Sequence, residues 1–295
     1  MNTFCIFIFS LPWPTVRSRS RQAVALMVAT LLLWFAGSAQ ADLLARAKAG
    51  ETLRIGFANE VPWAYPGTDN QPLGFVNAYT LAVLHKMGFD KIEPVVTEWG
   101  GLIPGLKAKR FDIVTGGMYI LKERCNNVAF SDPMGEFGDA FIVPRGNPKH
   151  IETYRDIASR NLVFVTGAGY NQIKVARKEG IADNNIMQVP GPTEILAAVR
   201  AGRADAGGVT YFTALNLAKK VGGVEVTDPG KLPEWTRNWV GIAFRKGDTA
   251  FRDAFNKAQA AYLGTDEMLA VVKKYGYTRK QLPGKVTTQY ACKNR

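Results

Sequence analysis

The sequence predicts an α/β protein built from two lobes, and three features carry this prediction. Residues 113–115 form a short β-branched run typical of a buried parallel strand. Residues 102–112 and 195–205 match at equal offsets in apolar residues, basic residues and a terminal Asp, and each leads into a strand with a Gly pair. Residues 140–144 and 240–244 are two further apolar runs, each followed by a basic-glycine turn. Two similar lobes joined by a pair of hinge strands explain all three features.

The expected domain boundaries follow from these strands. The length of 295 residues suits two domains. Residues 42–144 and 240–295 are expected to form a discontinuous lobe one, and residues 145–239 lobe two. The runs at 140–144 and 240–244 are interpreted as paired hinge strands that let rigid lobes close over a ligand.

Composition and charge argue against a nucleic-acid function. The chain is 47% hydrophobic and 21% charged, which is ordinary for a globular protein. Its net charge is +12, to which Arg17, Arg19 and Arg21 contribute before any acid appears. Because no dense Lys/Arg block with interleaved aromatic residues occurs, a solvated surface explains the remaining charge better than binding to nucleic acid.

The first 41 residues have the organisation of a cleaved signal peptide. The basic residues precede an apolar run at 23–36, and Ala39-Gln40-Ala41 has the small-x-small form of a signal-peptidase site. The run is shorter than the roughly 20 residues that span a bilayer. Cleavage before Asp42 and export to the periplasm are therefore predicted.

Two cysteines remain after this cleavage. Cys5 would be removed, and Cys125 and Cys292 would enter an oxidising compartment. They either form a disulfide or stay as two buried thiols, because the sequence gives no distance between them.

In lobe one, candidate ligand-binding residues follow each predicted strand. Residues 52–58 form the first strand, and Glu60 and Trp63 in the loop after it could present a carboxylate and an aromatic face to one cation. The alternative is an exposed Glu beside an anchoring Trp. A helix over residues 74–87 and a strand over residues 95–98 follow, and the second strand leads to Trp99, which either contacts the ligand or packs in the core.

The strand at 113–115 leads to the strongest candidate site. Gly116 and Gly117 are expected to end the strand and to let a ligand lie against the backbone. Tyr119 adds a flat ring and Arg124 a planar two-pronged donor, which together suggest a site for a small acid. A strand, a turn and a solvated Arg are the alternative.

Lobe two offers a backbone site. Residues 162–166 form its first strand, and the loop after it lacks the third glycine of a dinucleotide-binding motif. A helix beginning near Asn171, together with the backbone of Gly169, could bind a carboxylate. Residues 249–277 are expected to be helical and to pack onto lobe one.

Residues 111–133, FDIVTGGMYILKERCNNVAFSDP, resemble the polar amino-acid class of periplasmic solute-binding proteins of ABC importers. The resemblance implies the two-lobed type II periplasmic binding fold, a ligand between the lobes and permease subunits as partners. The two isolated histidines, the lack of a Ser/His/Asp order that suggests a triad and the lack of spaced metal ligands leave no catalytic residue or metal site to assign. A monomer without cofactor is expected. In this interpretation Arg124 holds a ligand carboxylate, Glu60 faces the positive charge, and aromatic residues surround the ligand body, namely Trp63, Trp99 and Tyr119.

The lobe-two pattern departs from this class at one position. Amino-acid binders place an acid five residues after the equivalent of Asp205, and here that residue is Thr210. An aromatic box with one carboxylate suits a delocalised cation better than a primary amine. Within this class the sequence resembles binders of ectoine or hydroxyectoine, which are compatible solutes of osmoprotection. An amino acid, a betaine and an arogenate or prephenate dehydratase-like enzyme are the alternatives.

Overall fold

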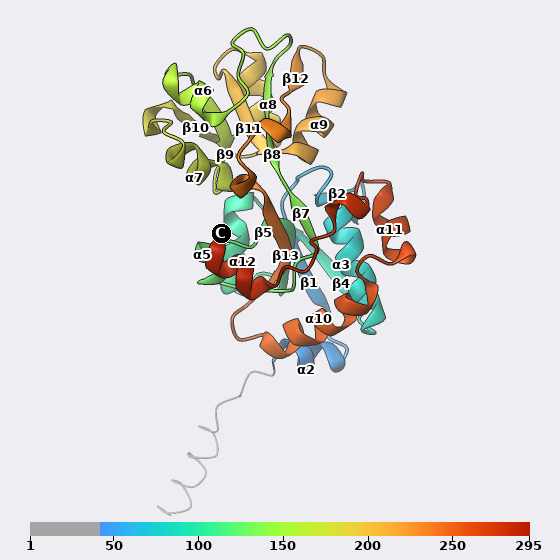
Figure 1. Cartoon of the computed structure of the whole chain (residues 1–295). Coiled ribbons are helices and arrows are strands. Elements are labelled where there is room, and N and C mark those ends of the chain that lie inside the picture. Colours follow the sequence, from blue (N-terminus) through green and yellow to red (C-terminus); the bar gives the residue numbers. More distant parts are fainter. Residues whose placement is uncertain (1–41) are drawn as a thin grey trace, which may run out of the picture. The chain divides into compact units, whose positions relative to one another are not determined.

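The computed structural model describes residues 42–295. The predicted signal peptide, residues 1–41 with its cleavage site before Asp42, lies outside the described residues. The described part contains two mixed sheets, each with helices packed on its faces (Figure 1). The chain is therefore an α/β protein of two lobes, as the sequence predicts.

The sheet of lobe one runs in the order β4-β1-β5-β13-β6, and β7 also pairs with β13. The strands β4, β1 and β5 are parallel, whereas β13 is antiparallel to β5. The strands are β1 (Leu53–Phe57), β4 (Ile92–Val96), β5 (Ile113–Tyr119), β6 (Ala129–Phe130), β7 (Gly135–Phe137) and β13 (Asn238–Phe244), with a separate hairpin of β2 (Tyr65–Pro66) and β3 (Pro72–Leu73).

Helices cover the lobe-one sheet, and the helices α10 and α11, which follow the last strand, pack against α3. The predicted helical region at 249–277 thus packs onto lobe one. The helices are α2 (Leu43–Lys48), α3 (Phe75–Lys86), α4 (Leu102–Lys107), α5 (Lys122–Cys125), α10 (Thr249–Tyr262), α11 (Asp266–Lys273) and α12 (Thr288–Asn294), with short 3-10 helices η1 (Trp99–Gly101) and η5 (Arg279–Gln281). None of the helices between residues 42 and 295 is long and apolar enough to cross a membrane.

Lobe two repeats this plan with the sheet order β10-β9-β11-β8-β12. Helices α8 and α9 pack on its strands. The strands are β8 (Asp139–Pro144), β9 (Phe164–Gly167), β10 (Ile186–Val189), β11 (Ala206–Thr210) and β12 (Val224–Val226); the helices are α6 (Tyr154–Ser159), α7 (Asn171–Lys178), α8 (Pro192–Arg200), α9 (Tyr211–Lys220), η2 (Asp183–Asn185), η3 (Pro229–Lys231) and η4 (Glu234–Thr236).

The internal sequence repeat corresponds to a repeated structural unit. In lobe one, Asp112 stands just before β5, and its carboxylate accepts a hydrogen bond of 3.0 Å from the backbone N–H of Arg54 at the start of β1. In lobe two, Asp205 stands just before β11, and its carboxylate accepts one of 2.8 Å from the backbone N–H of Val163 beside β9. Each terminal Asp of the repeat therefore joins the starts of two neighbouring parallel strands.

The predicted domain boundary at residue 144 and the predicted hinge pairing are wrong. Strand β8 belongs to the lobe-two sheet, where Asp139 lies opposite Thr210. It is β7 that pairs with β13, with Phe137 opposite Asn238. The chain therefore changes sheet at Gly138, and lobe two begins at Asp139. Two apolar runs of similar sequence do not reveal their partner strands, which is why the sequence misplaced this crossing.

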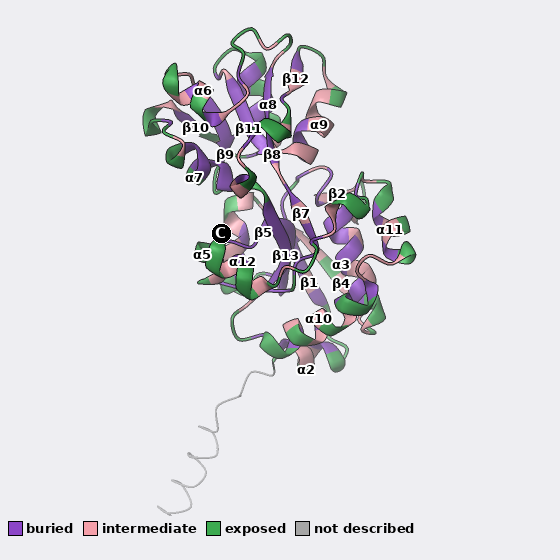
Figure 2. Ribbon diagram, in the orientation of Figure 1, coloured by how far each residue is buried: buried purple, intermediate pink, exposed green. Residues whose placement is uncertain are grey.

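The Gly pair does not end the central strand. Strand β5 continues through Gly116 and Gly117 to Tyr119, and antiparallel β13 pairs with it on both sides of the Gly pair, with Val240 opposite Tyr119 and Ala243 opposite Val114. Figure 2 shows the strands of both sheets as largely buried and the outer faces of the helices as exposed. The carboxyl ends of the central strands therefore meet where the two lobes face each other.

Candidate functional site

Segments from both lobes line one cavity, whose empty volume is about 400 Å³ when the space at its opening to solvent is included. Lobe one contributes residues that follow β1 and β4 and residues of β5 and α5, and lobe two contributes residues that follow β9 and residues at and after the end of β11. These are the carboxyl ends of parallel strands, where open α/β sheets bind ligands. The lining residues are Glu60, Trp63, Trp99, Gly116, Gly117, Tyr119, Arg124, Tyr170, Asn171, Gln172, Thr210 and Thr213.

Arg124 is a buried cation in this lining, 8% exposed. Its Nη1 donates to the backbone carbonyl of Tyr119 at 3.3 Å, and its Nη2 donates across to the carbonyl of Gly169 in lobe two at 3.2 Å. The neighbouring Glu123 pairs with Lys174 instead. Burial lowers the pKa of Arg124 to about 10. A desolvated guanidinium that donates only to carbonyl groups is well suited to receive a ligand carboxylate.

Glu60 supplies the one carboxylate among the lining residues. Its Oε1 accepts a hydrogen bond from the hydroxyl of Tyr170 in lobe two. Burial raises the pKa of Glu60 to about 7, and the hydrogen bond from Tyr170 opposes this rise. A cation placed beside Glu60 would favour the ionised form, so this side of the cavity suits the positive end of a ligand.

Trp63 is more enclosed than the sequence suggests. Its ring is 3% exposed and packs against Phe75 and Phe137, at centroid distances of 4.8 and 4.5 Å. Gly117 has φ +78°, and a Cβ there would lie 2.4 Å from Trp63. Gly117 was expected to lack a side chain so that a ligand could approach the backbone. Gly117 does line the cavity, but the absence of its side chain makes room for Trp63.

Trp99 connects the lobes at the other side of the cavity. Its Nε1 donates to the carbonyl of Gly169 at 3.2 Å, and its ring meets Tyr170 edge to face at 5.5 Å. The carbonyl of Gly169 therefore accepts hydrogen bonds from lobe one. The backbone of Gly169 was expected from the sequence to help bind a ligand carboxylate. Helix α7 begins at Asn171, as predicted, and Asn171 lines the cavity.

Two threonines complete the lobe-two wall. Trp63 Nε1 donates to Thr210 Oγ1 at 3.0 Å and to Thr213 Oγ1 at 3.1 Å. The two hydroxyl oxygens are 2.9 Å apart and share a hydrogen bond. Thr210 thus lies in the lining where amino-acid binders are expected to carry an acid.

Eight of the nine residues predicted to bind ligand line this one cavity, and Gly169 contributes through its carbonyl. Some lining residues were not predicted from the sequence, and only Thr213 among them had a clear signal there. Thr213 lies three residues after Thr210, a spacing that places two residues on the same face of a helix. Tyr170 and Gln172 flank Asn171, so any of the three residues was a candidate. The missed lining residues are Tyr170, Gln172 and Thr213.

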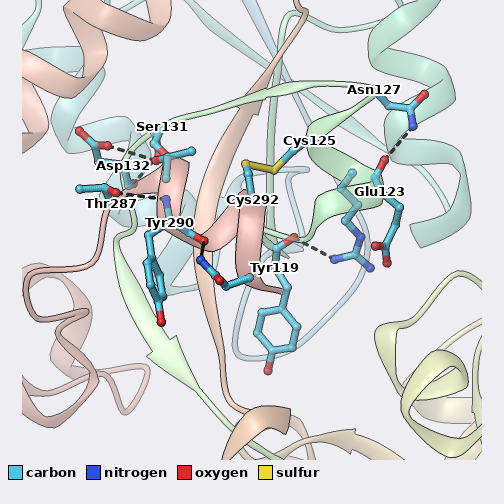
Figure 3. The surroundings of a disulfide bond; sticks show 12 residues. Tyr119, Glu123, Cys125, Asn127, Ser131, Asp132, Thr287, Tyr290 and Cys292 are labelled. Carbon is cyan, nitrogen blue, oxygen red and sulfur yellow. Dashed lines mark hydrogen bonds between the residues drawn. A yellow bond between two sulfur atoms is a disulfide. The ribbon is translucent and has the colours of Figure 1, made fainter. Parts of the chain in front are cut away.

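The structure joins Cys125 to Cys292 by a disulfide, with 5.8 Å between their Cα atoms (Figure 3). The bond holds α12, near the chain end, against α5. Because Arg124 precedes Cys125 in α5, the disulfide supports the helix that carries the buried guanidinium. Among residues 42–295, no group of His, Cys, Asp or Glu side chains has a geometry that could hold a metal ion.

Comparisons with known proteins agree with this architecture. Residues 53–278 match the family described as "Bacterial extracellular solute-binding proteins, family 3". A probable amino-acid ABC transporter periplasmic-binding protein of Sinorhizobium fredii, y4tE, is 34% identical over 92% of this chain and 93% of its own. The L-cystine-binding protein TcyJ of Escherichia coli is 27% identical over 86% of this chain and 92% of its own.

Solved structures show the same arrangement of lobes. EhuB in complex with hydroxyectoine is 29% identical and superposes with a TM-score of 0.78, over 85% of this chain and 99% of that one. An ancestral amino-acid-binding protein described as a precursor of cyclohexadienyl dehydratase is 26% identical with a TM-score of 0.69, over 79% of this chain and 99% of that one. With this fold, and with a family match that covers most of its length, the chain belongs to the family 3 bacterial extracellular solute-binding proteins.

Proposed function

We propose that this protein is the periplasmic receptor of an ABC importer and that it captures ectoine or hydroxyectoine in the cavity between its lobes. The transport role is supported by a relative named as an ABC transporter periplasmic-binding protein at 34% identity. The ligand is supported by the hydroxyectoine complex of a structural neighbour at 29% identity and by the chemistry of the cavity. Release of the mature chain at Asp42 completes the proposal, and N-terminal sequencing of the exported protein tests it.

The observation that carries the ligand proposal is the pair of opposite charges in one buried, aromatic cavity. Arg124 offers a guanidinium whose hydrogen bonds go to two backbone carbonyls. Glu60 offers the one carboxylate among the lining residues. Rings of Trp99, Tyr119 and Tyr170 belong to the same lining. A small zwitterion with a carboxylate and a delocalised, weakly hydrated cation matches this set of groups.

The threonine pair explains why an α-amino acid fits less well. Two hydroxyl groups carry two protons, and one proton is used in the bond between Thr210 and Thr213. Trp63 and the backbone N–H of Thr213 add further donors to the same two oxygens. Among the described residues the second hydroxyl proton has no acceptor, so this wall donates hydrogen bonds to the cavity. An α-ammonium, which is itself only a donor, gains nothing there and loses its water.

An amino acid is the second candidate, because relatives are named for cystine and arginine binding. In that case the α-ammonium would have to use Glu60. The test is calorimetry on protein freed of endogenous ligand by unfolding and refolding, with ectoine, hydroxyectoine, arginine, glutamine and cystine titrated separately.

The two candidates predict different outcomes in this titration. We expect micromolar binding of ectoine or hydroxyectoine and at least a hundredfold weaker binding of the amino acids. Thr213→Val, which keeps the side-chain shape and removes the hydroxyl, should weaken binding of the zwitterions. The matched control is Thr249→Val, at the start of α10 and outside the cavity lining. Tight binding of an amino acid without binding of ectoine would replace the first candidate with the second.

A further inference from the structure

Asp139 is a buried carboxyl group at the point where the chain passes from lobe one to lobe two. It is the first residue of β8, directly after Gly138, and it is 1% exposed. It does not line the cavity, yet it contacts three residues that do. Its backbone lies opposite Thr210 in the lobe-two sheet. Its Oδ1 accepts hydrogen bonds from Tyr119 and from Gln172.

These two hydrogen bonds come from different lobes. The hydroxyl of Tyr119, on β5 of lobe one, donates to Asp139 Oδ1 at 3.4 Å. The Nε2 of Gln172, on α7 of lobe two, donates to the same oxygen at 2.8 Å. One acceptor atom therefore ties a lining ring of one lobe to a lining amide of the other. A rotation that separates the lobes must strain or break the bond from Tyr119.

The other oxygen of this carboxyl group has no partner. Asp139 Oδ2 is buried and accepts no hydrogen bond among the described residues. The titratable groups that face the carboxyl are Tyr119 and Tyr154, the latter on α6. The cations Arg124 and Arg237 lie near Tyr119 and oppose the rise of its pKa that burial causes. A bare, buried oxygen without a cation beside it is a poor place for a negative charge. Burial accordingly raises the pKa of Asp139 to about 7, against the hydrogen bonds from Gln172 and Tyr119.

We propose that Asp139 is a positioning residue of the binding site: at the crossing between the lobes, its carboxyl group holds Tyr119 and Gln172 in the cavity wall. It acts through these two residues and does not touch the ligand. The proposal rests on the proposed function only for the choice of ectoine as the probe.

Three substitutions separate this role from simple packing. Asp139→Asn keeps one acceptor oxygen and the shape of the protonated carboxyl, and it removes ionisation. Asp139→Leu keeps a similar volume and removes the acceptor. Asp248→Leu is the matched control, since Asp248 is another buried acid, 8% exposed, whose partner Arg245 lies in lobe one outside the cavity lining.

Calorimetry with ectoine is the first measurement. We expect the Asn variant to bind within about threefold of wild type, and the Leu variant to lose about tenfold or more because two donors lose their acceptor. Tyr119→Phe and Gln172→Leu should each cost affinity in the wild-type background and little in Asp139→Leu, because the residues act as one unit. The control Asp248→Leu should lower stability and leave affinity unchanged. Equal affinities of wild type and Asp139→Leu, or an equal loss in the Asn and Leu variants, would overturn the proposal.

The pH dependence of stability is the second measurement and needs no ligand. A carboxyl with a raised pKa in the folded state destabilises the protein progressively as pH rises from about 4 to about 7. Asp139→Asn lacks this effect, so the Tm of Asp139→Asn minus that of wild type should grow over this range and stay constant above it. A difference that does not change with pH would show that the pKa of Asp139 is not raised in the folded state. If wild type fails to bind ectoine, the proposed ligand is wrong and this series still decides the state of Asp139.

Discussion

Replacing Arg124 should raise the stability of the ligand-free protein while it removes binding. The guanidinium is buried, and burial lowers its pKa well below the usual value, to about 10. At about 1.4 kcal/mol for each pH unit, this corresponds to about 3 kcal/mol by which the charged group destabilises the folded state at neutral pH. Arg124→Met fills similar space without charge. Because the carbonyls of Tyr119 and Gly169 lose their donor, we expect the free energy of unfolding of Arg124→Met to exceed that of wild type by only about 1 kcal/mol.

Affinity should change in the opposite direction. Without the guanidinium a ligand carboxylate would be buried unpaired, which costs about 3 kcal/mol or more and corresponds to at least a hundredfold loss. Arg124→Lys keeps the charge and loses the two-pronged geometry, and we expect it to weaken binding by about 2 kcal/mol, which is a roughly thirtyfold loss of affinity. Urea unfolding without ligand and calorimetry with ectoine measure the two quantities.

A half-buried arginine with ion-pair partners is the control. Arg245 contacts Asp112 and Asp248 in lobe one, so Arg245→Met should lower stability and leave affinity unchanged. An Arg124→Met protein that is several kcal/mol less stable than wild type and binds ectoine normally would refute the reasoning.

Further variants probe the enclosed tryptophan, the disulfide and the buried glutamate. Trp63→Phe keeps an aromatic ring between Phe75 and Phe137 but removes the N–H that reaches both threonines, so calorimetry should show a fivefold to tenfold loss of affinity, about 1 kcal/mol, and Tm should fall because the smaller ring leaves a void. Replacing Cys125 and Cys292 by Ser opens a loop of 167 residues and should lower the free energy of unfolding by up to about 5 kcal/mol in urea titrations, and a change below about 1 kcal/mol would contradict this. Glu60, with its pKa raised to about 7, should release a proton when a cation binds beside it, so calorimetry at about pH 7 in two buffers should detect proton release that Glu60→Gln abolishes.

The sequence predicted the lobes and most of the cavity because local patterns encode them. Each repeat ends in an Asp that joins two strand starts, and each strand end carries polar or aromatic residues. The partner of a strand is not local information, which explains why residues 140–144 were assigned to lobe one and why β5 was ended at the Gly pair. Asp139 shows the same limit, since its importance arises from Tyr119 and Gln172, which are distant in sequence and belong to different lobes.

The role of Trp63 also depended on the fold. An aromatic residue three positions from an acid suggested a face for a cation, and the sequence contained no sign that Phe75 and Phe137 would enclose the ring. What remains for the cavity is the indole N–H, which binds the threonines of the opposite lobe. Enclosure of a side chain is a property of tertiary packing and cannot be read from spacing alone.

A crystal structure of the protein with ectoine would test the proposed binding mode most directly. We expect ectoine to lie in the cavity between the lobes, with its carboxylate on Arg124 and its cyclic amidinium toward Glu60, and we expect a donor from the pair Thr210–Thr213 to face an oxygen of the ligand. Ectoine bound outside this cavity, or bound with its carboxylate away from Arg124, would contradict this binding mode.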